Sequence, residues 1–104
     1  MHGANPERQD EKGNSALSIA ASTNATNCVR VLVEFGASVT TKNKRGSLPL
    51  HKATKRGYFD ISKILIEAGS PLDVKDTRLL TPIDYLFTFN QIGLMKQLFE
   101  DPVL

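Results

Sequence analysis

The sequence has one cysteine, no tryptophan and two histidines among its 104 residues. The single cysteine, Cys28, has no second cysteine in the chain with which to form a disulfide. No apolar run approaches the roughly 20 residues that a membrane-spanning helix needs, and the first residues carry no signal-peptide hydrophobic region. We therefore expect no membrane partner, and an intracellular location in the cytoplasm or the nucleus.

Cys28 stands at the start of a helical pattern, which predicts a small buried side chain in a reducing compartment. The alternative is a reactive thiol, which needs a basic or histidine neighbour that the local sequence does not offer. We expect Cys28 to lie in the core.

Residue types that carry chemistry are too few or too scattered to predict an active site. His2 and His51 have no second histidine or cysteine at metal-ligand spacing. Acidic residues are scattered over turns and helix ends, with no pair placed for acid–base catalysis. Gly13, Gly46 and Gly57 are too far apart for a phosphate-binding loop, and no serine has an identifiable histidine base. We expect no enzyme activity, no cofactor and no metal.

The bulk composition is that of one ordinary globular domain. Hydrophobic residues make up 40% and charged residues 23% of the chain, so intrinsic disorder is not expected. The formal net charge of +2 is weak evidence for a polyanionic partner.

The dominant feature is an internal repeat of 33 residues, clearest from Asn43 to Asp76. Equivalent positions in three copies carry the same or similar residues, and a fixed period of this length is typical of solenoid proteins. The matching triplets are Gly13, Gly46 and Leu79; Leu17, Leu50 and Ile83; Ala20, Ala53 and Leu86; and Leu32, Leu65 and Leu98.

These copies resemble the ankyrin repeat family, whose pattern runs Asp-x-x-Gly-x-Thr-Pro-Leu-His-x-Ala and later Val-x-x-Leu-Leu-x-x-Gly-Ala. The middle copy matches at Gly46, Pro49, Leu50, His51, Ala53, Gly57, Ile61, Ile64, Leu65 and Gly69. The first copy matches at Asp10, Gly13, Leu17, Ala20, Ala21, Val31, Leu32, Gly36 and Ala37, and the third at Asp76, Thr81, Pro82, Ile83, Leu94 and Leu98.

The resemblance implies an all-α solenoid of stacked helix-turn-helix repeats joined by β-hairpin-like loops. Residues 10–42, 43–75 and 76–104 would be the three repeats of a single domain. Gly3-Ala4 lies 33 residues before Gly36-Ala37, so residues 1–9 are interpreted as the tail of a preceding repeat in a longer array. The alternative is a natural N-terminal tail that happens to match.

Local signals place the helices within each copy. Ser15 is expected to cap a helix that runs to about Thr23, and Asn24 to end it in the left-handed conformation. A second helix is expected from about Thr26 to Phe35, with Cys28, Val31 and Leu32 on one stripe.

The middle and third copies depart from the family pattern at helix starts and turns. Leu48 replaces the usual threonine and removes a cap worth about 1 kcal/mol, for which Ser47 is the neighbouring hydroxyl that could compensate. In the third copy Leu79 replaces the turn glycine, while Thr81 restores the cap. There Asp84-Tyr85 stands where the family has its histidine, and a last helix is expected from Ile92 to about Glu100.

His51 lies in the helix-opening motif, and the resemblance implies that it hydrogen-bonds backbone and braces neighbouring copies rather than catalysing a reaction. Such helix pairs gain stability from stacking on their neighbours. The first copy lacks a neighbour on one side, so we expect the region of Ile19, Val29 and Val31 to fray or to contact another molecule.

The resemblance also implies that hairpin tips and the first helices form a concave groove that binds other proteins. Carried over, that groove has a basic middle and an apolar end at Leu80 and Phe89. The expected partner-binding residues are Lys12, Lys44, Arg45, Lys55, Arg56, Arg78, Leu80 and Phe89. The alternative is that the charges only solvate one face and that Leu80 and Phe89 pack under the chain's end.

The sequence thus favours a protein-interaction module, a scaffold or adaptor that binds an acidic partner segment with apolar anchors. One alternative is nucleic-acid binding through Lys44, Arg45, Lys55, Lys63 and Arg78, which the mild net charge and the absence of a binding motif make a weaker hypothesis. Another is a targeting or regulatory domain of a larger enzyme. The partner and the oligomeric state cannot be predicted.

Overall fold

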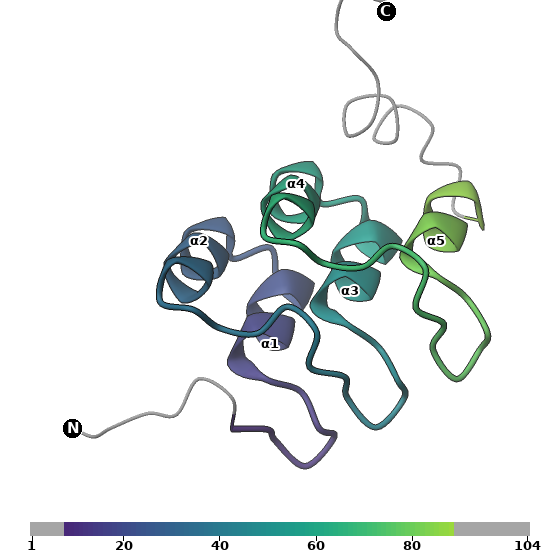
Figure 1. The fold of residues 1–104 in the computed structure, drawn as a ribbon, viewed down its shortest axis with the longest axis horizontal. Coiled ribbons are helices and arrows are strands. Elements are labelled where there is room, and N and C mark those ends of the chain that lie inside the picture. Colours follow the sequence, from purple (N-terminus) through teal and green to yellow (C-terminus); the bar gives the residue numbers. More distant parts are fainter. Residues whose placement is uncertain (1–7, 89–104) are drawn as a thin grey trace, which may run out of the picture.

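The computed structural model describes residues 8–88, which form five helices in two rows. α1 (Ala16–Ser22), α3 (Pro49–Arg56) and α5 (Pro82–Thr88) form one row, and α2 (Thr26–Glu34) and α4 (Phe59–Glu67) form the other (Figure 1). The first row begins at Ala16, Pro49 and Pro82, at the 33-residue period of the sequence. Neighbouring helices pack within and between the rows. Within residues 8–88 the only β-pairing is an isolated bridge between Gln9 and Ser15. The predicted all-α solenoid is confirmed.

Three short loops precede the helices of the first row and project to the same side (Figure 1). We name residues 10–14 hairpin 1, residues 43–47 hairpin 2 and residues 76–80 hairpin 3. In each, the first side chain folds back on its own loop, since one carboxylate or amide oxygen accepts two backbone N–H groups at 2.8–3.1 Å. These first residues are Asp10, Asn43 and Asp76.

Backbone hydrogen bonds also tie each hairpin to the next. The Lys44 N–H donates to the Lys12 carbonyl at 3.0 Å, and the Thr77 N–H donates to the Arg45 carbonyl at 2.8 Å. The approach is so close at Gly13 that a Cβ there would lie 2.9 Å from the Lys44 nitrogen, so only glycine fits. The hairpins therefore form a row beside the helices in which each is hydrogen-bonded to the next.

Helix starts and stops follow the local sequence. The Ser15 Oγ accepts the Ser18 N–H at 3.2 Å, which caps α1 as expected, and Asn24 closes it at a φ of 60°. The Leu48 side chain has no polar atom and cannot cap α3, so the cap bond that the family pattern supplies is missing there. Thr81 and Asp84 cap α5 reciprocally, because the Thr81 Oγ1 accepts the Asp84 N–H and the Asp84 Oδ2 accepts the Thr81 N–H.

The core lies between the two helix rows and is made of apolar side chains from four helices. Its fully buried members include Leu17, Val29, Leu50, Ile61 and Leu65. Burying these side chains removes apolar surface from water, which is the main stabilising contribution in such a layer.

Two predictions about α2 are wrong. Cys28 is exposed rather than buried, and Val29 is fully buried rather than part of a face open to another molecule. Successive residues of an α-helix point about 100° apart, so a buried Val29 turns Cys28 and Val31 away from the core. Ile19 and Val31 are 43% and 47% exposed, as expected of a face that no other described helix covers. Fraying of the first copy stays a prediction, and the helix expected from Ile92 to Glu100 lies outside the described residues.

Leu79 occupies the turn position that glycine holds in hairpins 1 and 2, and it keeps the same backbone conformation with a φ of 65°. A left-handed conformation costs an L-residue roughly 1–2 kcal/mol, while glycine adds about 0.5–1 kcal/mol of unfolded-state entropy. Leu79→Gly is therefore expected to raise the free energy of unfolding by about 0.5–1 kcal/mol, measured by urea denaturation. Leu79→Ala is the control, because it shortens the side chain and leaves the strain in place. Equal stability of the glycine and alanine variants would contradict the strain.

Candidate functional site

The hollowed surface of the described residues lies along the hairpins and the first helix row. A cavity of about 100 Å³ opens between hairpin 2, hairpin 3 and the exposed side of α3. A shallower depression of about 380 Å³ lies between hairpins 1 and 2. Arg45 and Lys52 line both, so the two hollows join into one surface.

The walls of these hollows carry a concentration of positive charge. Lys52, Lys55 and Arg56 come from α3, where spacings of three and four residues place side chains on one helix face. Arg45 and Arg78 reach the cavity from the hairpins on either side, and Lys12 and Lys44 line the shallower depression. We call the surface formed by these seven cations the basic groove.

Few of these cations are neutralised within the protein. Among residues 8–88, the cations whose side chains make no hydrogen bond or ion pair include Arg45, Lys52, Arg56 and Arg78. Lys52 is half-buried, and desolvation, followed by the charges of Arg56 and Lys55, lowers its pKa. The groove therefore holds like charges close together, an arrangement that an incoming anion would relieve.

The floor of the cavity between hairpins 2 and 3 is a hydrogen-bonded network of buried side chains. The Tyr85 hydroxyl donates to the Asp76 Oδ2, and the Asp76 Oδ1 accepts the N–H groups of Arg78 at 2.9 Å and Leu80 at 3.1 Å. Burial, together with the Asp76 carboxylate, raises the pKa of Tyr85 to about 12. Burial alone would raise the pKa of Asp76, but the hydrogen bonds from Tyr85, Leu80 and Arg78 outweigh it and lower that pKa. Asp76 is thus ionised and fully bonded.

His51 lies beside this network and joins two repeats. Its Nδ1 accepts the Leu48 N–H at 2.9 Å, so the neutral ring carries its proton on Nε2 and donates to the carbonyls of Val74 at 2.9 Å and Leu80 at 3.1 Å. The ring meets Tyr85 edge to face at 5.9 Å between centroids. Desolvation is the main reason that the pKa of His51 is lowered. These contacts are those of a structural histidine, as the sequence predicted.

The structure brings together six of the eight residues that the sequence singled out for partner binding. Lys55, Arg56, Arg45 and Arg78 line the cavity, and Lys12 and Lys44 line the depression next to it. Leu80 is half-buried and lines neither hollow, whereas its neighbour Leu79 is 71% exposed. Phe89 lies outside the described residues.

Sequence reasoning missed several side chains of the cavity, among them Lys52, Asp76 and Tyr85. The signal for Lys52 was present, because it precedes Lys55 and Arg56 by three and four residues on the same helix. Asp76 and Tyr85 are nine residues apart, and only the stacking of hairpin 3 against α5 shows that they meet.

In the described part of the chain, no group of three or more histidine, cysteine, aspartate or glutamate side chains could hold a metal ion. None of the helices described is both long and apolar enough to cross a membrane.

The chain is similar in sequence to a known protein family and to individual proteins. A family model described as ankyrin repeats (3 copies) matches residues 1–76. The chain is 36% identical over 75 residues to the E3 ubiquitin-protein ligase KEG of Arabidopsis thaliana, which is 71% of this chain and 5% of the ligase. It is 34% identical over 90 residues to human Rabankyrin-5, 84% of this chain and 8% of that protein. It is 38% identical over 61 residues to human protein phosphatase 1 regulatory subunit 27, 59% of this chain and 40% of the subunit.

Proposed function

The chain belongs to the ankyrin-repeat family, and from that premise we propose that its basic groove binds an acidic segment of a partner protein. Ankyrin repeats are generally protein–protein interaction modules and are typically non-catalytic. The observation that carries the proposal is the group of four cations in the groove that have no side-chain partner in residues 8–88. A partner's carboxylates or other anions would supply the missing counter-charges.

The rigidity of the groove supports binding of an extended segment. Backbone hydrogen bonds hold hairpins 1, 2 and 3 at fixed spacing, so little conformational entropy is lost on the module's side when a partner docks. The basic side chains would speed encounter and orient the segment. At the end of the groove we propose an apolar contact through Leu79, which is 71% exposed, with Leu80 and Phe89 as the further anchors that the sequence predicted.

Substitutions of the exposed, strained Leu79 test whether this side chain contacts the partner. Leu79→Gly is expected to weaken partner binding about threefold to tenfold while stabilising the free chain, measured by calorimetry on the same samples. Leu79→Met keeps an apolar side chain and should retain most of the affinity. If the glycine variant binds as tightly as the parent chain, Leu79 is not an anchor.

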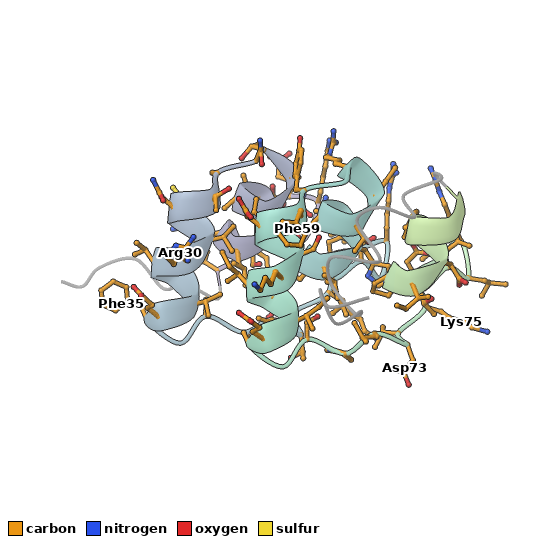
Figure 2. All side chains as sticks on the ribbon, turned by 90° about the horizontal axis from the view of Figure 1, so that it is seen from above. Arg30, Phe35, Phe59, Asp73 and Lys75 are labelled. Carbon is orange, nitrogen blue, oxygen red and sulfur yellow. The ribbon has the colours of Figure 1, made fainter. Side chains whose placement is uncertain are left out.

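A pull-down tests the proposal as a whole. The parent chain, Arg45→Glu/Arg56→Glu and the control Arg30→Glu/Lys63→Glu would be used as baits, with captured proteins quantified by mass spectrometry. Both double variants change the formal net charge by the same amount, but Arg30 lies on α2 and Lys63 on α4, in the row away from the hairpins (Figure 2). Partners lost from the groove variant and kept by the control support the proposal, and equal loss from both would contradict it.

Nucleic acid is the second candidate ligand for the basic groove. The same unpaired cations favour it, but His51 and Tyr85, the rings nearest the cavity, are 2% and 3% exposed and cannot offer a stacking platform for bases. A steep fall in affinity with salt for a random oligonucleotide, tighter than for any protein partner, would favour this candidate.

The chain spans 5% of the plant ligase and 40% of the phosphatase subunit that it resembles, so it matches only a part of each. A targeting or regulatory role within a larger enzyme is therefore compatible with the proposed binding, with catalysis located elsewhere. An exposed, unpaired thiol such as Cys28 persists best in a reducing environment, which leads us to propose the cytoplasm or the nucleus.

A further inference from the structure

The cavity between hairpins 2 and 3 has the chemistry of a site for one compact, doubly charged anion. We propose that it binds the phosphate group of a phosphorylated serine or threonine side chain in the partner segment. The inference rests on the proposed function, because it names the chemical group by which a partner would be recognised in the basic groove.

The positive charge exceeds what a single carboxylate would balance. The exposed Arg45, Arg56 and Arg78 line the cavity, and the half-buried Lys52 lines it from α3. None of these four side chains makes a hydrogen bond or an ion pair with a described residue, although the Asp10 carboxylate acts on Lys52 electrostatically. A phosphate monoester carries about −1.5 to −2 charges at neutral pH and three acceptor oxygens. Arginine forks bind such oxygens in pairs, so this anion satisfies more of the available donors than a carboxylate can.

The one acidic residue in the cavity does not compete for these cations. Asp76 is 6% exposed, and its two oxygens already accept the Tyr85 hydroxyl and the N–H groups of Arg78 and Leu80. The hydrogen bonds of its carboxylate are therefore made to donors in the floor and not to the arginine side chains of the wall. The hydroxyl-bearing residues Ser47 and Thr77 also line the cavity and add further polar surface.

The shape of the cavity favours a phosphate at the end of a side chain. The volume of about 100 Å³ is several times the ~10–15 Å³ that one water needs, and the floor is closed by the buried His51, Asp76 and Tyr85. A terminal phosphate can enter this partly open cavity. A phosphodiester within a nucleic-acid backbone would have to lie across its mouth.

Amide chemical shifts of the ¹⁵N-labelled chain would test the inference. The probes are N-acetyl-phosphoserine-N-methylamide, the same compound with serine or glutamate, and two degenerate peptide libraries that differ only in a fixed central serine or phosphoserine. We expect the phosphoserine probes to shift the amides of Arg45, Lys52 and Arg78, and the phosphoserine library to bind at least tenfold more tightly than its serine counterpart.

Neutralising variants identify the cavity as the site. Lys52→Gln and Arg78→Gln should each weaken phosphoserine binding about tenfold, whereas the exposed Arg30→Gln on α2 removes the same charge and should have little effect (Figure 2). Amide shift dispersion shows whether each variant is folded. Because there are two variants, the phosphoserine affinity of one still tests the site if the other does not fold.

Each alternative outcome overturns the inference in a distinguishable way. Equal binding of glutamate and phosphoserine would make the site a carboxylate site, and equal weakening by Arg30→Gln would reduce it to diffuse attraction. Tighter binding of a single-stranded oligonucleotide or of vesicles containing phosphoinositide would assign the phosphate to another class of ligand. If the serine library shifts the groove as strongly as the phosphoserine library, this inference fails while the proposed function stands. If neither library shifts the groove, both fail.

Discussion

Replacing His51 with alanine is expected to lower the free energy of unfolding by about 3 kcal/mol. The ring is 2% exposed and accepts the Leu48 N–H through Nδ1. Through Nε2 it donates to the Val74 carbonyl at the end of its own repeat and to the Leu80 carbonyl of the following repeat. Alanine would leave these buried groups without partners and remove the edge of the ring from Tyr85. For a domain of this size the loss corresponds to a fall of roughly 10–20 °C in the melting temperature.

The control for His51→Ala is Arg56→Ala on the same helix, where the exposed side chain should cost less than 0.5 kcal/mol. Urea unfolding and thermal melts followed by circular dichroism would measure both. A loss below about 1 kcal/mol for His51→Ala would mean that the bonds to the Val74 and Leu80 carbonyls do not brace the two repeats.

The same ring predicts how stability depends on pH. Burial lowers the pKa of His51 below the ordinary histidine value of 6.5, so the unfolded chain binds a proton more readily than the folded one. Stability from this group is fully present above pH 6.5 and is lost as the pH falls through the lower, folded-state pKa. The difference in stability between the parent chain and His51→Ala should therefore shrink as the pH is lowered from 7 to 5.

Reversing Arg45 and Arg56 to glutamate is expected to slow association with the protein partner about 10–100-fold. Both side chains line the cavity between hairpins 2 and 3, and the double change turns a region of positive potential negative. Long-range attraction acts mainly before contact, so the association rate should change more than the dissociation rate. Its dependence on salt should also weaken or reverse.

Surface plasmon resonance with the partner recovered in the pull-down would measure these rates at several ionic strengths. Arg30→Glu/Lys63→Glu is the matched control, with the same change in net charge on the other helix row. An association rate and salt dependence unchanged by Arg45→Glu/Arg56→Glu would remove the basic groove from the binding mechanism.

The repeated pattern of the sequence was sufficient to predict the helices and their order. Leu17 and Leu50 stand one period apart and are both fully buried, and Ser15 caps α1 as its position before an apolar run suggests. A 33-residue period predicts this because every copy must bury the same face against its neighbours. Asn24 could likewise be assigned to a helix end, since asparagine tolerates a positive φ.

The remaining features depend on geometry that the period does not specify. Cys28 and Val29 are adjacent in sequence, and which of them faces the core is decided by the rotation of α2 against α1 and α4. For Leu79 and Leu80, too, the sequence does not specify which side chain is exposed. The left-handed turn at Leu79 exposes Leu79 and turns Leu80 partly inward. The contact between Asp76 and Tyr85 forms only when hairpin 3 folds onto α5.

Mapping the partner on the ¹⁵N-labelled chain by cross-saturation is the most direct test of the central claim that the basic groove is a docking surface. The account predicts that the affected amides lie in hairpins 1 to 3 and on the exposed side of α3, with Arg45, Arg56 and Arg78 among them. It also predicts that α2 and α4 stay unaffected (Figure 1). An affected surface centred on Arg30, Phe35 and Phe59 of the other helix row, with the hairpins unaffected, would contradict it (Figure 2).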